Sequence, residues 1–84
     1  MNKTQKLDIA MQLADYSELL LERLEQNPTE VLPSGRTACT RYREGLTERM
    51  ELIRGWATTG PRWNDVFFRF ERCSNRLSEL EEQG

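Results

Sequence analysis

The sequence predicts an all-α fold, an antiparallel three-helix bundle in which residues 1–84 form a single helical domain. Apolar residues recur every three or four positions along three separate stretches. No stretch alternates polar and apolar residues with the period of a β-strand, and proline and glycine residues separate the three stretches. A more extended helical protomer, whose core is completed by dimerisation, is the alternative architecture.

The first helix is expected over residues 3–27. Asn2 and Gln5 have the spacing of a capping box at its start, and Pro28 disfavours helical geometry at Asn27, which should end it. The buried face is predicted to hold the residues that keep a three-four spacing, namely Leu7, Ala10, Ala14, Ser17, Leu21 and Leu24.

A loop over residues 28–35 and a second helix over residues 36–58 are expected next. The loop contains two prolines and one glycine, and Ser34 is a candidate N-cap for the helix that follows. Gly45 is unusual inside a helix, and we expect it to allow a close approach of a neighbouring helix. The apolar stripe of this helix consists of Cys39, Tyr42, Leu46, Met50, Ile53 and Ala57.

A short turn at residues 59–60 separates the second helix from a third helix over residues 61–82. Gly60 suits the position just past a helix end, and Pro61 suits the first position of the next helix. Because the turn is short, these two helices should be antiparallel neighbours. The third helix carries a heptad seam of Trp63, Val66, Phe70, Cys73, Leu77 and Leu80.

Several kinds of chemistry lack their usual residues in this chain. It contains no histidine, which is the commonest general base and metal ligand, and it has no glycine-rich phosphate loop. Cys39 and Cys73 are too few for a four-thiolate zinc site, and both should be free, buried thiols. Asp15, Glu18 and Glu22 share one helical face, which we interpret as a solvated acidic face. We therefore expect no enzymatic activity, no cofactor and no metal site.

The chain is weakly acidic overall, but it is rich in arginine. There are 12 basic and 14 acidic residues, which gives a net charge of −2. This balance disfavours a nucleic acid as partner, because binding to phosphates usually requires a basic domain. The sequence has no apolar run long enough to span a membrane and no visible leader, so a cytoplasmic protein is expected.

Two surfaces are candidates for binding a partner. The first is an arginine face on the second helix, formed by Arg36, Arg43 and Arg54, which fall within about 60° of one another on a helical wheel. These side chains could bind an acidic protein or phosphates. They could equally form an ordinary solvated face beside neighbouring glutamates, and the sequence leaves this open.

The second candidate surface consists of apolar residues that lie off the buried stripes. Leu19 is surrounded by polar positions of the first helix, and Phe68 lies next to Arg69 and Arg72 in the third. Asp65 and Arg69 have the spacing of an i,i+4 ion pair. Phe68 is either an exposed anchor for a partner or packs under the loop against Val31 or Leu32, and the sequence supports both interpretations.

These patterns favour a small non-catalytic protein–protein interaction module, either an adaptor or an inhibitor that occludes the surface of a partner protein. A phage or mobile-element accessory protein is one interpretation, based on background frequency and on no motif of the chain. A nucleic-acid-associated regulator that uses the arginine face is an alternative, and a structural assembly subunit is another. A homodimer is compatible with a structural assembly subunit, and it is also compatible with the extended protomer that completes its core by dimerisation.

Overall fold

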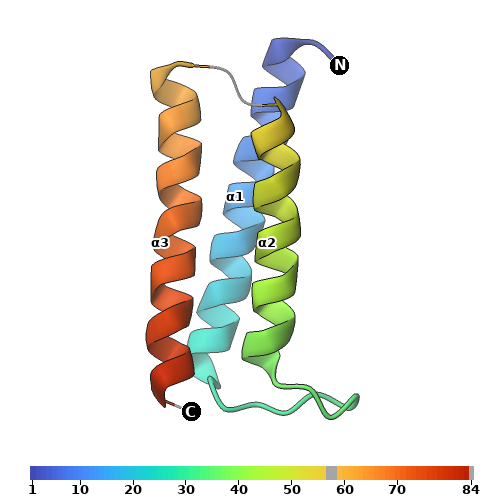
Figure 1. Ribbon diagram of the computed structural model, residues 1–84, viewed down its shortest axis with the longest axis vertical. Helices are drawn as coiled ribbons and strands as arrows, with labels where there is room; N and C mark the ends of the chain where they lie inside the picture. The colour runs from blue at the N-terminus through green and yellow to red at the C-terminus, as the bar shows by residue number, and fades with distance from the viewer. Residues whose placement is uncertain (57–58, 84) are drawn as a thin grey trace.

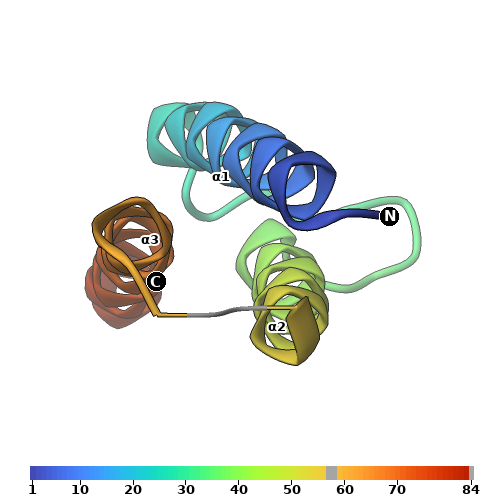
Figure 2. The ribbon, with the colours of Figure 1, turned by 90° about the horizontal axis from the view of Figure 1, so that it is seen from above.

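The computed structural model describes residues 1–56 and 59–83, and this part of the chain holds three α-helices (Figure 1). They are α1 (Lys3–Gln26), α2 (Ala38–Trp56) and α3 (Pro61–Gln83). The chain runs down α1, up α2 and down α3, so that α2 is antiparallel to both neighbours (Figure 1). Seen from above, the helices occupy the corners of a triangle (Figure 2). The predicted three-helix bundle is therefore confirmed, with overall dimensions of 40 × 22 × 17 Å.

The predicted capping box starts α1. The backbone N–H of Gln5 donates to Oδ1 of Asn2 (2.8 Å), and the backbone N–H of Asn2 donates to Oε1 of Gln5 (3.0 Å). These two bonds satisfy donors that have no partner within the helix. The helix ends at Gln26, one residue before the expected end, because Asn27 precedes Pro28 and leaves helical geometry.

The second helix starts two residues later than expected, and Ser34 is not its cap. Val31 forms an isolated antiparallel bridge with Thr37, which extends the connection as far as residue 37. Oγ1 of Thr37 accepts from the backbone N–H of Thr40 (3.1 Å), and this bond caps α2. The Ser34 hydroxyl instead accepts from Arg36 within the turn (3.4 Å). The bridge is a local pairing within the connection, and Thr37, which is a common type of N-cap residue, was the sequence signal that the choice of Ser34 overlooked.

The structure tests the predicted turn before α3 but not the predicted end of the second helix. The expected end at residue 58, and Ala57 of the apolar stripe, lie outside the described residues. Gly60 has a positive φ of 151°, and Pro61 is the first residue of α3, as the sequence predicted. α3 extends to Gln83, one residue beyond the expected end.

The core is built from the predicted stripes and closes within one copy of the chain. At its centre lie Ile53, Phe70 and Leu77, whose side chains have no exposed surface. The buried residues of α1 and α3 are those of the two predicted stripes. In α2, Met50 is only half-buried, while Gly45 is buried. A second copy is therefore not required to cover the apolar faces.

Candidate binding surfaces

The arginine face of α2 is largely engaged in ion pairs. Arg36 lies in the connection before α2 and pairs with Glu44. Arg43 reaches α3, where its Nε donates to Oε2 of Glu81 (3.1 Å). The bond raises the pKa of Arg43 and lowers the pKa of Glu81. Arg54 is exposed and forms no ion pair with any described residue.

Arg69 links α3 to α1 and does not pair with Asp65. Its Nε donates to Oε2 of Glu18 (3.1 Å), and its Nη2 bonds to Asp15. Only 18% of the Arg69 side chain is exposed. The bonds to the two carboxylates raise the pKa of Arg69. Two members of the expected acidic face are therefore held by an arginine, and Arg69 has little surface left to offer a partner.

Phe68 lies in solvent on the outward face of α3. Its exposed fraction is 57%, so the loop does not cover the ring; Val31 is itself exposed, and Leu32 lines a cleft between α1 and α2. On a helical wheel Phe68 lies about 170° from the middle of the buried seam of α3. The guanidinium carbon of Arg72 lies 5.9 Å from the centroid of the ring. Leu19 is also exposed, outside the buried stripe of α1.

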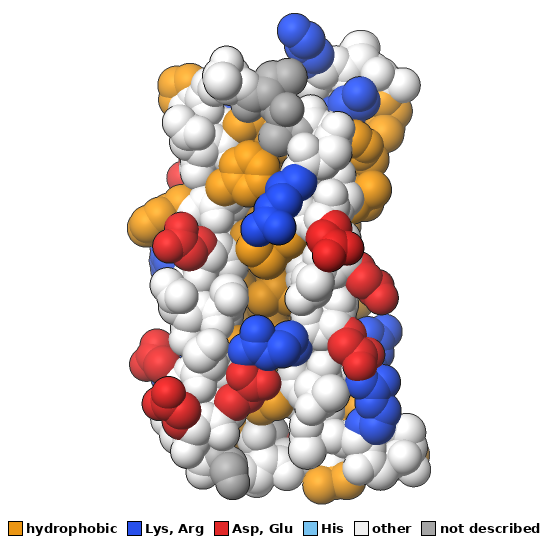
Figure 3. Space-filling view, viewed as in Figure 1, with side chains coloured by type: hydrophobic (Ala, Val, Ile, Leu, Met, Phe, Trp, Pro, Cys, Tyr) orange, Lys and Arg blue, Asp and Glu red, His pale blue; other side chains and the backbone are white. Residues whose placement is uncertain are grey.

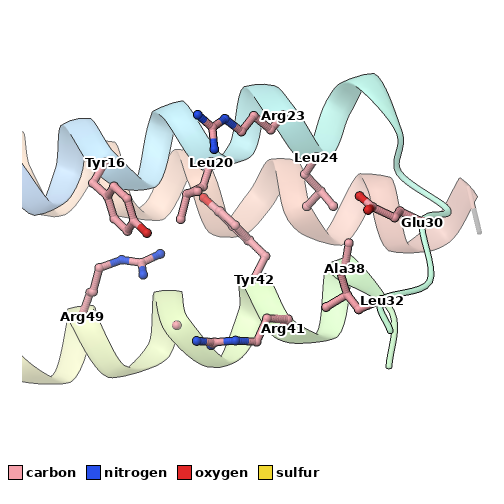
Figure 4. A pocket seen from close by; sticks show the side chains of 11 residues that line it. Tyr16, Leu20, Arg23, Leu24, Glu30, Leu32, Ala38, Arg41, Tyr42 and Arg49 are labelled. Atoms are coloured by element: carbon pink, nitrogen blue, oxygen red, sulfur yellow. The ribbon is translucent and has the colours of Figure 1, made fainter. Parts of the chain in front are cut away.

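Sequence reasoning did not predict a cleft between α1 and α2, which has a volume of about 300 Å³ (Figure 4). Its apolar lining comes mainly from Leu20 and Leu24 of α1 and from Leu32 of the connection before α2. Three arginines, Arg23, Arg41 and Arg49, also line the cleft, together with Tyr16, Glu30, Ala38, Tyr42 and Gly45.

A network of polar groups holds α1 and α2 together at this cleft. Ser17 is completely buried, and its hydroxyl accepts a bond from Nε of Arg49 (2.8 Å). The Tyr42 hydroxyl donates to the backbone carbonyl of Ser17 (2.8 Å), and burial raises the pKa of Tyr42. The guanidinium of Arg49 lies 5.3 Å from the centroid of the Tyr16 ring, and Figure 4 shows the two side chains facing each other. The sequence signal for this network was a serine within the apolar stripe of the first helix, because a buried hydroxyl needs a hydrogen-bond partner.

Gly45 provides room for arginine side chains and not for a neighbouring helix. A Cβ placed on Gly45 would lie 2.9 Å from Nη1 of Arg49 and 3.6 Å from Nη1 of Arg41. No backbone atom of another helix is among its nearest neighbours. The expectation of a close helix approach at this position was therefore wrong. The space beside Gly45 is occupied by the guanidinium groups of Arg41 and Arg49.

Both cysteines are free and buried, as expected. Burial raises the pKa of each thiol, which lowers the fraction of reactive thiolate. Across residues 1–56 and 59–83, no three side chains of the metal-binding types cluster in a way that could hold an ion. None of the described helices is both long and apolar enough to cross a membrane.

Comparisons of the chain with protein-family models, with curated proteins and with solved structures give no match.

Proposed function

We propose that this chain is a small non-catalytic protein–protein interaction module, an adaptor or an inhibitor that covers part of a partner protein. The observation that carries the proposal is the exposure of Phe68. The core closes without this ring, yet the ring stands in solvent on α3 with Arg72 beside it. Phenylalanine and arginine are both enriched at protein interfaces, and an aromatic anchor with a polar rim is typical of binding hot spots.

The ionisable groups support a binding role over a catalytic one. The two thiols are the strongest nucleophiles of the chain, and burial with a raised pKa makes them unreactive. Arg36 and Arg43 are neutralised by glutamates, which weakens the alternative of a nucleic-acid regulator that uses this face. The proposal therefore places the contact with the partner on apolar surface.

The proposal predicts that Phe68→Ala separates binding from stability. Loss of a buried anchor typically weakens association by about 2 kcal/mol, or roughly thirtyfold in Kd. Because the ring is exposed in the free protein, the melting temperature should change by no more than about 2 °C. Leu52→Ala is a matched control, since Leu52 is an exposed apolar residue on another helix. It should change neither quantity.

The partner is identified by affinity capture from an extract of the source cell with wild-type and Phe68→Ala protein as parallel baits. Proteins that the wild type retains and the variant loses are purified, and their Kd is measured by calorimetry. A variant that binds the purified partner as tightly as the wild type would reject Phe68 as the anchor. A steep loss of affinity with added salt would indicate instead that the contact is electrostatic.

A further inference from the structure

The cleft between α1 and α2 is lined by arginines that form no ion pair with any described residue. Four of the ten arginines form ion pairs with described residues, namely Arg36, Arg43, Arg69 and Arg76. Three of the remaining six, Arg23, Arg41 and Arg49, line this one cleft. Glu30 is the single carboxylate among the lining residues, and it forms no ion pair with any of them.

Two of these arginines are brought together although their charges repel. Nη1 of Arg49 and Nη1 of Arg41 both lie within 4 Å of the same point above Gly45. Figure 4 shows Arg41 lying along α2 toward the base of the Arg49 side chain. Like charges this close raise the free energy of the folded protein unless an anion lies between or beside them.

Arg49 also has a donor with nothing to bind. Its Nε is satisfied by Ser17, but its Nη2 is buried and has no hydrogen-bond partner among the described atoms. A buried donor of a charged group is rarely left unsatisfied, because the loss of its bonds to water is not compensated. The closeness of the two guanidiniums therefore points to an anionic ligand, and Arg49 has a donor that no described group uses.

We propose that this cleft binds a glutamate or aspartate side chain that belongs to an acidic, leucine-containing segment of a partner protein. A planar carboxylate matches the planar fork of a guanidinium and can accept two parallel bonds from it. The leucines that line the cleft, Leu20, Leu24 and Leu32, suit an aliphatic side chain beside the carboxylate. Glu30 at the rim, and the net charge of −2, disfavour the higher charge density of a nucleic acid.

This inference deepens the proposed function and rests on it for the class of partner, but it uses a different surface. Phe68 is exposed on α3, whereas the residues that line the cleft belong to α1, to α2 and to the connection between these two helices. Two contact surfaces that share no residue allow one copy of the chain to hold two protein segments at once. The arrangement therefore favours an adaptor over an inhibitor with a single contact.

The experiment titrates the full chain with the peptide acetyl-Leu-Glu-Glu-Leu-amide and, separately, with acetyl-Leu-Gln-Gln-Leu-amide. Binding is followed by NMR through the backbone amides of α1 and α2 and the Nε–H signal of Arg49. The acidic peptide should shift these signals with saturation in the millimolar range, as expected of a short peptide. The glutamine peptide should bind at least tenfold more weakly, because the charge-assisted bonds are lost.

Three variants test whether binding of the acidic peptide depends on the cleft itself or on the overall charge of the protein. Gly45→Ala places a Cβ 2.9 Å from Nη1 of Arg49 and should weaken binding of the acidic peptide at least about threefold. Its melting temperature should be equal or higher, because alanine favours a helix over glycine. Arg41→Gln should weaken binding about tenfold. Arg62→Gln removes the same charge from an exposed arginine outside the cleft and should leave binding unchanged.

Equal binding of the two peptides, or an equal loss in Arg62→Gln and Arg41→Gln, would overturn the proposal. Tighter binding of a thymidine octanucleotide than of the acidic peptide would overturn the assignment of the ligand as a carboxylate. Phe68→Ala should leave peptide binding unchanged. If the peptide does not bind while Phe68→Ala still loses the captured partner, the cleft is rejected and the proposed function stands.

Discussion

Ser17 and Trp63 show how single residues set the packing of this bundle. Ser17 is buried on the apolar stripe of α1, and it is tolerated because its hydroxyl donates to the carbonyl of Leu13 and accepts from Arg49. Trp63 opens the seam of α3 with 6% of its surface exposed, and its ring centroid lies 6.4 Å from that of Phe67. The first residue fixes a polar link between helices, and the second fills apolar volume near one end of α3.

Trp63→Ala should destabilise the fold strongly. Truncation of a buried large aromatic residue costs about 3–5 kcal/mol, which is a large share of the stability of a domain of this size. The melting temperature, followed by circular dichroism, should fall by at least about 12 °C. Phe68→Ala, an aromatic truncation five residues along the same helix, serves as the comparison. A Trp63→Ala protein that melts like the parent would place the indole outside the core.

At the scale of the helices, ion pairs hold α1 and α3 in register. Arg69 meets Glu18, and Arg76 meets Glu25 (3.2 Å), so both links join residues that are 51 positions apart. A constant separation is the mark of two parallel helices. Figure 3 shows the face formed by α2 and α3, where apolar side chains run along the seam and charged ones lie across it at intervals.

Arg69→Gln should loosen this register and lower stability moderately. The Arg69 side chain is mostly buried, but Asp15 is largely exposed, so solvent screening reduces the effect to about 1 kcal/mol. The melting temperature should fall by about 4–8 °C. Arg62→Gln should have a smaller effect, since Arg62 is exposed and forms no ion pair with described residues.

The same variant tests whether Arg69 contacts a partner, as its sequence position beside Phe68 suggests. Its affinity should be measured at a temperature where the variant is fully folded. Because the guanidinium is held by two carboxylates, we expect the Kd for the captured partner to stay within about threefold of the wild-type value. A larger loss of affinity would restore Arg69 as a contact residue.

At the scale of the whole molecule, the two cysteines report how completely the bundle closes. Both thiols are buried, and Sγ of Cys39 donates to the backbone carbonyl of Pro28 (3.4 Å). A raised pKa means that a smaller fraction of each thiol is ionised at a given pH than in an unfolded chain. Reaction therefore requires the bundle to open and is further slowed by the low thiolate fraction.

Alkylation by iodoacetamide at pH 8, followed by mass spectrometry, should be at least about a hundredfold slower in the native protein than in guanidinium chloride. Cys73 should react more slowly than Cys39, because it lies deeper in the core. Two thiols per chain should titrate after denaturation without reductant. Native rates equal to the denatured ones would mean that the bundle is open in solution.

The sequence by itself determined the helices and the residues that they bury. Spacing of three and four, the Asn2–Gln5 box, Pro28 and the Gly60–Pro61 turn are local signals, and they act within a few residues of where they occur. For this reason the buried sets of α1 and α3 could be predicted completely, and the ends of the helices to within two residues wherever they are described. The exposure of Phe68 was one of two outcomes that the same wheel left open.

The tertiary structure decided which charged groups meet. Arg69 could have paired with Asp65, but the parallel neighbour α1 offers two carboxylates at the same level. The guanidiniums of Arg49 and Arg41 lie beside Gly45, and Arg49 is held there by a hydrogen bond to Ser17 of α1, 32 positions away in the chain. Long, flexible side chains can reach several partners, and only the packing of the helices fixes which one is near. The cleft therefore follows from tertiary packing, beyond the range of any local pattern.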